Sequence, residues 1–369
     1  MDGPESGHVA GDVPGVTGLT GRERISYSVR ILLSHALYYT GILRLLQWVV
    51  FRRKAVVLVY HRVLTNEQRT RTASQPGLVV GDETFARHVA LLKRLFTVLT
   101  LDEFERHLAR REPFNGPSCL VTFDDGWIDN YENALPVLRA HGVPAAMFLP
   151  VNFIGQRRMF SREALTLLMV EAVKVSRADA TRAAALRPHL ASLQLEHVLE
   201  VAADDPLDAV IRIVGVHRYA SGPEFEATLA KLAAELALSA ADLSRVDGFI
   251  DWGQVESMGR QGFTFGGHGA DHCVLTRVPA DVIRCEVTTS KNVLDGRLAI
   301  PVSAFAYPNG AWNAEVASVV KAAGYSLAFT VDAGPVSCDD DPLSVRRINI
   351  HEGMTGNSPM FLARLVGVF

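Results

Sequence analysis

Two carboxylates stand side by side where a mostly apolar run of the chain ends. The run Ser118–Phe123 is rich in strand-forming residues, which predicts a buried strand, and it leads into Asp124, Asp125 and Gly126. Adjacent carboxylates disfavour each other's ionisation. A metal ion removes that penalty, because it takes one carboxylate as a ligand and leaves the other free to act as a base. This stretch therefore predicts a metal site at a strand end.

Two histidines follow a similar apolar run later in the chain. Phe263–Phe265 leads through glycines to His268, and His272 follows with three residues between them. On a helical turn this spacing puts both imidazoles on one face, where they can bind one ion. Two histidines and one aspartate that leave coordination positions open are typical of a hydrolytic metal site.

Thr122–Gly126 together with His268 and His272 resembles the polysaccharide deacetylase family, which is carbohydrate esterase family four, with its chitooligosaccharide deacetylase homology domain. The resemblance covers about Ala55 to Phe369 apart from a long insertion. It implies a hydrolase of carbon–nitrogen bonds other than peptide bonds, a carbohydrate deacetylase. Three further stretches agree in order and spacing with the family, namely Val57–Val63, Phe305–Gly310 and Arg347–Ile350.

The resemblance implies a role for each residue of the predicted metal site. Asp124 would be the general base that activates a water, while Asp125, His268 and His272 would bind a divalent metal ion, most often zinc. The chemistry agrees with these roles, since a metal polarises an acetyl carbonyl while a neighbouring carboxylate accepts the proton.

The turn after a late strand supplies the next candidates. A tetrahedral oxyanion needs a backbone N–H donor in addition to the metal. Alignment of Tyr307–Gly310 with the family's Pro-Pro-Tyr-Gly turn gives this role to the N–H of Asn309. Tyr307, Trp127 and Trp312 are the aromatic side chains that we consider for stacking on a sugar.

Three departures from the family pattern affect the site. Gly269 replaces the usual Ser or Thr after the first metal histidine, which removes a side-chain hydrogen bond from the loop. Ala306 replaces the arginine that holds the catalytic base in the family. We expect Arg346 or Arg347 on the last strand to supply that charge, and we choose Arg347.

The third departure concerns the acid that protonates the leaving group, which in the family is a late histidine. His351 is the one histidine after His272 in the sequence, so we assign this role to it. Asp332 is expected to orient its imidazole, because a carboxylate commonly fixes a histidine tautomer. His61 ends the first predicted strand, and we expect it to line the site.

Strand and helix patterns alternate along the chain, which predicts parallel strands with helices outside. The polar candidates cluster at strand ends, and this suits a barrel. A dinucleotide-binding sheet would need a glycine-rich loop after the first strand, where the sequence has His61-Arg62-Val63 instead. The resemblance implies an α/β fold, a distorted (β/α)7-type barrel.

The chain divides into three parts by composition. We expect a disordered tail at residues 1–24, an apolar or amphipathic helix at 25–54, and the deacetylase barrel at 55–369. A helical insertion rich in Ala and Leu interrupts the barrel at about 156–249. The insertion is either a passive subdomain or oligomer contact, or a lid or substrate-selecting wall.

The composition is that of a soluble globular protein, with 369 residues, 48% hydrophobic residues and a net charge of −3. This mild charge gives no reason to expect nucleic-acid binding. Four scattered cysteines do not form a disulfide framework. No secretory signal is visible, so we expect a cytoplasmic enzyme, with membrane association through residues 25–54 as an extension of that expectation.

Residues 25–54 leave two interpretations open. The segment is either an amphipathic helix packed on the barrel or an interfacial helix with Arg52, Arg53 and Lys54 beside lipid headgroups. Its interrupting polar residues, Arg44 among them, disfavour a membrane span.

Three functions remain open at this point. The first is metal-dependent removal of an acetyl group from an N-acetylated sugar in an oligosaccharide, polysaccharide or lipid-linked glycan. The second is metal-dependent hydrolysis of a non-sugar amide or an O-acetyl ester on the same fold. The third is a non-catalytic carbohydrate-binding relative, which Gly269 and Ala306 favour and which the four retained site residues disfavour.

Overall fold

The computed structural model describes residues 21–215, 223–239 and 247–369. The tail predicted for residues 1–24 lies outside the described residues, except for 21–24, which begin the first helix. That helix, α1 (Gly21–Tyr39), is followed by α2 (Ile42–Phe51). The chain between them bends at Gly41, whose φ of 79° is left-handed, so residues 25–54 form two helices.

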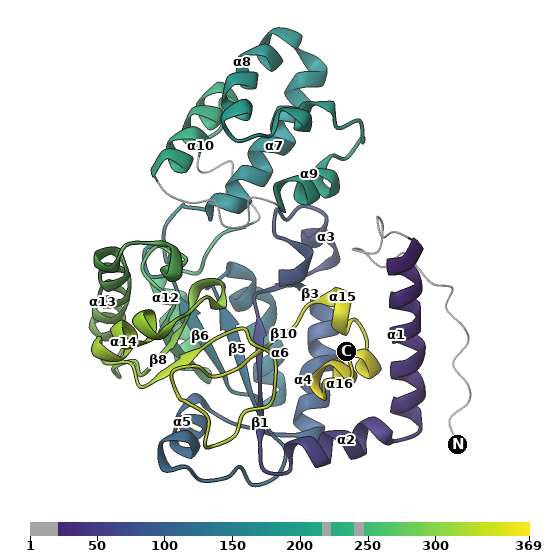
Figure 1. Cartoon of the computed structure of the whole chain (residues 1–369), viewed down its shortest axis with the longest axis vertical. Helices are drawn as coiled ribbons and strands as arrows, with labels where there is room; N and C mark the ends of the chain where they lie inside the picture. The colour runs from purple at the N-terminus through teal and green to yellow at the C-terminus, as the bar shows by residue number, and fades with distance from the viewer. Residues whose placement is uncertain (1–20, 216–222, 240–246) are drawn as a thin grey trace.

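One curved parallel sheet is the centre of the molecule (Figure 1). Its strands, in spatial order, are β10 (Ile348–Asn349), β1 (Ala55–Tyr60), β5 (Ser118–Asp124), β6 (Ala145–Leu149), β7 (Phe263–Gly267), β8 (Ala304–Ala306) and β9 (Leu327–Phe329), with β4 (Thr97–Val98) beside β5. Beyond β9, Thr330 N–H donates to Val345 O at 2.8 Å, which links β9 to the segment entering β10. The sheet thereby curls towards closure, and the predicted distorted barrel is confirmed.

Side chains of the strands alternate between the barrel interior and the surrounding helices, as the pleat requires. On β5, Leu120 packs inside with Phe148 and Phe329. Val121 and Phe123 pack outside with the core that the helices share. This alternation places Asp124 on the same side as Leu120, at the mouth of the barrel.

Helices cover the outside of the sheet (Figure 1). They are α4 (Asp82–Leu95), α5 (Leu101–Arg110), α6 (Leu135–His141), α12 (Trp252–Gly259), α13 (Ala280–Arg297), α14 (Ala314–Ala322) and α16 (Ser358–Leu365). Shorter elements complete the connections: β2 (Arg62–Leu64), α3 (Asn66–Arg69), η1 (Pro76–Leu78), β3 (Val79–Gly81), η2 (Asn130–Ala134), η5 (Leu275–Arg277), η6 (Pro308–Gly310) and α15 (Glu352–Thr355).

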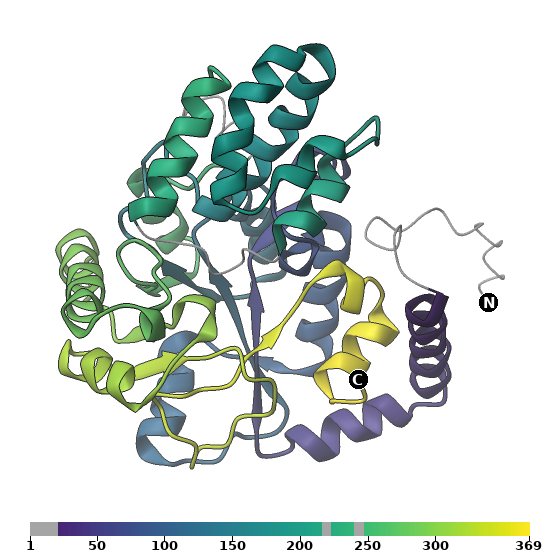
Figure 2. The ribbon, with the colours of Figure 1, turned by 45° about the horizontal axis from the view of Figure 1, so that its top comes forward.

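The segment between β6 and β7 forms a helical layer above one end of the sheet (Figure 2). Its described helices are α7 (Ser161–Ala178), α8 (Ala180–Ser192), η3 (Glu196–Glu200), α9 (Leu207–Val214) and α10 (Pro223–Glu235). These helices have an apolar core of their own, which includes Leu168, Leu190, Val210 and Leu232. This second core explains why the layer stands apart from the barrel.

The described helices include none that is both long enough and apolar enough to cross a membrane. Helices α1 and α2 instead lie against the barrel, where Leu43 and Phe51 are fully buried. Gln47 of α2 donates to the backbone oxygen of Leu95 at 2.9 Å, which joins this segment to α4.

We expect Gly266→Ala to destabilise the fold at the strand end that carries His268. A Cβ at Gly266 would lie 2.5 Å from Ala304 O and 2.6 Å from the Phe148 ring. Such overpacking between strands costs about 1–3 kcal/mol. Thermal or urea unfolding measures the loss.

The matched control is Gly296→Ala in α13, where a Cβ meets nothing within 4 Å. This change is expected to leave stability unchanged or to raise it by up to about 1 kcal/mol, since alanine favours helix. Equal effects of the two variants would contradict the tight packing between β7 and β8.

Candidate active site

Asp124 is held by a buried arginine. Arg347 Nη1 and Nη2 donate to the two carboxylate oxygens of Asp124, each at 2.7 Å. Both residues are buried, and Arg347 Nε donates to Thr330 O at 2.8 Å. Burial raises the pKa of Asp124, but Arg347 and His268 outweigh that effect and hold the pKa below its ordinary value. Asp124 is therefore ionised, as a general base must be.

The chain order explains how Arg347 reaches this position. Neighbouring side chains of an extended segment point to opposite sides, so Arg347 enters the barrel while Arg346 is exposed. Ala306 on β8 leaves the barrel without an arginine at the family's position, and the guanidinium arrives from the other edge of the sheet. Of the two arginines that the sequence offered, the structure brings Arg347 to Asp124.

Asp125, His268 and His272 form a group that could hold one metal ion. Asp125 Oδ1 lies 3.5 Å from His268 Nε2 and 3.3 Å from His272 Nε2. This oxygen is buried and has no hydrogen-bond partner among the described residues. Two imidazoles converging on an unpaired carboxylate oxygen fit a divalent cation.

The surroundings of this group prepare its ligand atoms. His268 Nδ1 lies 2.8 Å from Ala306 O and donates to it, which leaves the Nε2 lone pair free for a metal. Trp127 Nε1 donates to Asp125 Oδ2 at 3.0 Å, which leaves Oδ1 for the same ion. Trp127 is fully buried, so the suggestion that it stacks on a sugar is wrong.

A buried ion network fixes Trp127 in turn. The Arg62 guanidinium carbon lies 4.2 Å from the centre of a Trp127 ring. Arg62 Nε bonds Asp129 at 2.7 Å, and its Nη1 bonds Asp247 at 2.6 Å. Two carboxylates thus pair with a fully buried arginine, which packs against the indole that donates to Asp125.

Glu286 of α13 organises the loop that joins the two histidines. Its Oε2 accepts the backbone N–H groups of Ala270 at 2.9 Å and Asp271 at 3.0 Å. Gly269 has a φ of 78°, and a Cβ there would lie 2.9 Å from Glu286 Oε2. The loop therefore keeps its anchor although the hydrogen bond expected from Ser or Thr is missing.

Three site residues hold left-handed backbone conformations that are uncommon outside glycine. The φ values are 77° for Asp125, 58° for His272 and 56° for Asn309. After Asn309, Gly310 has a φ of 68°, and a Cβ there would lie 2.8 Å from Val331 N. Only glycine fits at this turn, so the backbone of Asn309 is held at the cavity.

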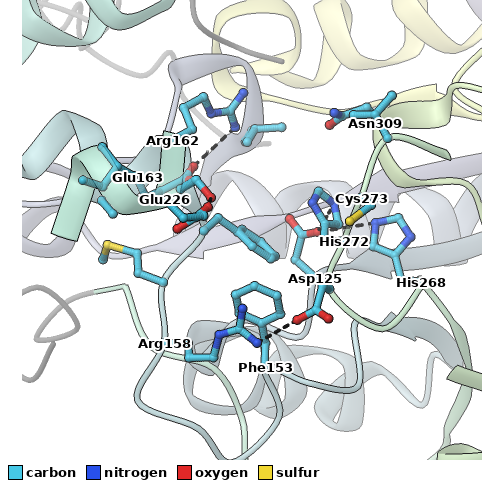
Figure 3. A pocket seen from close by; sticks show the side chains of 18 of the residues that line it. Asp125, Phe153, Arg158, Arg162, Glu163, Glu226, His268, His272, Cys273 and Asn309 are labelled. Carbon is cyan, nitrogen blue, oxygen red and sulfur yellow. Dashed lines mark hydrogen bonds and ion pairs between the residues drawn. The ribbon is translucent and has the colours of Figure 1, made fainter. Parts of the chain in front are cut away.

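The cavity at this end of the barrel has a volume of about 780 Å³. Asp125, His268, His272 and Asn309 lie on one side of it, and Arg162, Glu163 and Glu226 of the helical layer lie on the other (Figure 3). The helical layer thus forms a wall of the site.

Glu163 is the most unusual residue of that wall. It is 1% exposed, and its Oε2 has no hydrogen-bond partner in the described part of the chain. Burial raises its pKa despite the neighbouring Arg162. The sequence reading missed Glu163, although an acidic residue on the buried face of a helix was a signal for it.

His61 lies in the cavity as predicted. Its Nε2 is 4.0 Å from Asp124 Oδ2. His61 Nδ1 is buried and has no hydrogen-bond partner among the described residues.

The structure does not bring three other predicted residues to the cavity. His351 begins α15 and is not among the residues that line the cavity, and burial, with smaller effects of Arg364 and His61, lowers its pKa to about 4. Asp332 is exposed, and none of the described hydrogen bonds joins it to His351. Tyr307 is buried and donates to Leu343 O at 2.9 Å. The direction of each side chain, which its motif did not specify, explains these corrections.

Comparison with known proteins gives consistent matches. The family model for polysaccharide deacetylases matches residues 111–179 and 219–328. The relative named "Putative polysaccharide deacetylase YxkH", from Bacillus subtilis (strain 168), is 19% identical over 306 residues, which are 83% of this chain and 74% of that protein.

Two solved structures share the fold. The Streptococcus pyogenes deacetylase PplD in complex with acetate has a TM-score of 0.53 and 20% identity, covering 85% of this chain and 98% of that chain. IcaB from Ammonifex degensii has a TM-score of 0.53 and 19% identity, covering 85% and 97%. At these identities the likeness shows the fold alone.

We expect Arg347→Met to destabilise the protein by about 3–5 kcal/mol, because it leaves the buried Asp124 carboxylate without a counter-ion. Urea unfolding measures this loss. The adjacent Arg346→Met removes the same charge from an exposed position and should change stability by less than about 0.5 kcal/mol. Similar losses in both variants would show that the Arg347–Asp124 pair does not stabilise the fold.

Proposed function

We propose that this chain is a polysaccharide deacetylase, the family whose model matches residues 111–179 and 219–328, and that it acts as a metal-dependent N-deacetylase. Its substrate would be an N-acetylated sugar in an oligosaccharide, polysaccharide or lipid-linked glycan. The observation that carries the proposal is the unpaired Asp125 oxygen facing His268 and His272, with the ionised Asp124 next to it.

Asp125, His268 and His272 would hold the ion through one oxygen and two nitrogen atoms. This donor set suits zinc, which commonly takes histidine and carboxylate ligands and keeps a position open in catalytic sites. When bound, such an ion supplies Lewis acidity that polarises an acetyl carbonyl and lowers the pKa of a water molecule.

The residues of this chain would divide the remaining work. Asp124 accepts a proton from the attacking water, and Arg347 keeps the carboxylate oriented for it. The N–H of Asn309 donates to the oxyanion that develops on the acetyl group. These three groups would together serve the attack of water on the acetyl carbonyl, which is the first step of the acyl transfer.

The leaving amine needs a proton, and His61 is the better placed of the two candidate histidines. His61 lines the cavity beside Asp124, whereas His351 does not line it. We therefore move the acid role from His351 to His61.

One of the two residues that favoured a non-catalytic carbohydrate-binding protein no longer does so. Ala306 favoured it, because the family's arginine is missing there. Arg347 holds Asp124 with two hydrogen bonds, so the base retains its partner.

We expect Zn²⁺ to stabilise wild type, because it would bind the folded state only. At about one hundred times the dissociation constant the gain is about 2.7 kcal/mol. His272→Ala, which removes a half-buried ligand, should lose most of this gain, and a chelator should reverse it. The control His351→Ala should keep it. Zinc stabilisation that is equal in all three proteins would contradict the assignment of the ligands.

Acetate release tests the reaction itself. Purified wild type would be incubated with N-acetylglucosamine oligomers, O-acetylated glycans and an acetylated peptide amide, with metal content measured on the same samples. We expect release from the N-acetylated oligomers. Asp124→Asn should lower it about 10²–10⁴-fold while metal stays bound.

Two histidine variants separate the candidate acids in the same assay. His61→Gln should lower acetate release, and His351→Gln should leave it close to wild type. The reverse pattern would return the acid role to His351. Acetate release only from the O-acetylated glycans or the acetylated peptide amide would assign the protein to that other substrate class. Bound metal without acetate release from any substrate would contradict the deacetylase proposal.

A further inference from the structure

Helices α1 and α2 lie at the outer edge of the molecule (Figure 1), and both expose large hydrophobic side chains. The described part of the chain has eleven exposed large hydrophobic residues, and eight of them lie on these two helices. Of these eight, the most exposed are Tyr39 at 79%, Leu32 at 70% and Leu45 at 62%. The eight residues, which we call the α1–α2 surface, are Val29, Leu32, Leu33, Tyr39, Ile42, Leu45, Trp48 and Val49.

The opposite side of both helices is fixed to the barrel. Leu43 and Phe51 are fully buried, and Gln47 bonds the backbone of α4. Arg30 of α1 contacts Met354 Sδ at 3.4 Å and lies 5.8 Å from the Phe369 ring. The helices therefore cannot turn their exposed apolar side inward without losing these contacts.

Apart from Glu23 in the first turn of α1, the ionised side chains that α1, α2 and the following segment to Asn66 contribute are all positive. The sequence contains no Asp or Glu between Ile25 and Asn66. Arg44 lies within α2, and Arg52, Arg53 and Lys54 follow it, all four exposed. Basic residues beside an exposed apolar face complement a surface that has an apolar interior covered by a negatively charged outer layer.

We propose that the α1–α2 surface binds the surface of a membrane that contains anionic lipids. The apolar side chains would enter the boundary between headgroups and acyl chains, with both helices lying in the membrane plane. Arg52, Arg53 and Lys54 would contact the lipid phosphates. Trp48 and Tyr39 are of the residue types that favour this boundary.

This surface is separate from the candidate active site. Within the described ranges, none of the residues that line the cavity comes from α1 or α2. Membrane binding and acetyl removal can therefore succeed or fail independently in experiments.

Vesicle flotation with the purified full chain tests the proposal. We expect binding to phosphatidylcholine vesicles mixed with phosphatidylglycerol, weaker binding to phosphatidylcholine alone, and a decrease with added salt. Leu45→Glu combined with Trp48→Glu should weaken binding at least about tenfold, because it puts two carboxylates on the apolar face. The control Ile300→Glu changes a residue that is 76% exposed elsewhere and should bind as wild type does.

A second variant tests the charges without touching the apolar face. Arg52→Ala with Arg53→Ala should weaken binding to the anionic vesicles about fivefold or more per charge and leave binding to phosphatidylcholine unchanged. Because both arginines are exposed, this variant should fold even if the double glutamate variant does not, and a Tm measurement verifies each. Acetate release from a soluble glycan should remain unchanged.

Failure of wild type to float with either vesicle overturns the proposal. Equal flotation of wild type and both double variants overturns it as well. Light scattering would identify the alternative occupant, a second copy of the chain. A dimer that Leu45→Glu with Trp48→Glu dissociates, in a protein that binds no vesicle, would assign the α1–α2 surface to self-association.

Discussion

Two neighbouring carboxylates buried at the end of one strand impose the main constraint on this structure. Unassisted, Asp124 and Asp125 would repel each other in a site with little water to screen them. The fold stabilises each by different means. Asp124 accepts two hydrogen bonds from the Arg347 guanidinium, while Asp125 accepts one from Trp127 and faces two imidazoles. The division leaves one oxygen of Asp125 unpaired, which is what a metal ligand requires.

The sequence predicted which residues converge on the candidate metal site, but the helical turn expected for His268 and His272 was wrong, because this segment is a loop with left-handed residues. Asp125, His268 and His272 follow strand ends, and parallel strands bring their ends to one edge. The choice of Arg347 over Arg346 also has a local reason, because alternate residues of an extended segment face opposite sides. The fold class followed from the alternation of strand and helix patterns together with the family resemblance.

Other parts of the site depend on tertiary contacts that no local pattern encodes. His351 had the expected position in the sequence, yet it starts a short helix and does not line the cavity, whereas His61, which follows the first strand, does. Tyr307 belongs to the correct turn, but its side chain enters the core. Glu286 and Glu163 come from helices without a motif. Glu286 binds the loop between the two histidines and Glu163 lines the cavity only because their helices pack there in the folded protein.

The origin of Arg347 has a consequence for how the protein is made. The arginine follows Asp124 by 223 residues, so a growing chain exposes the carboxylate long before its partner leaves the ribosome. Until then the strand end carries an uncompensated charge that resists burial. The ion pair at the mouth of the barrel can form only after residue 347 has been synthesised. A product truncated before residue 347 therefore lacks the guanidinium that pairs with Asp124.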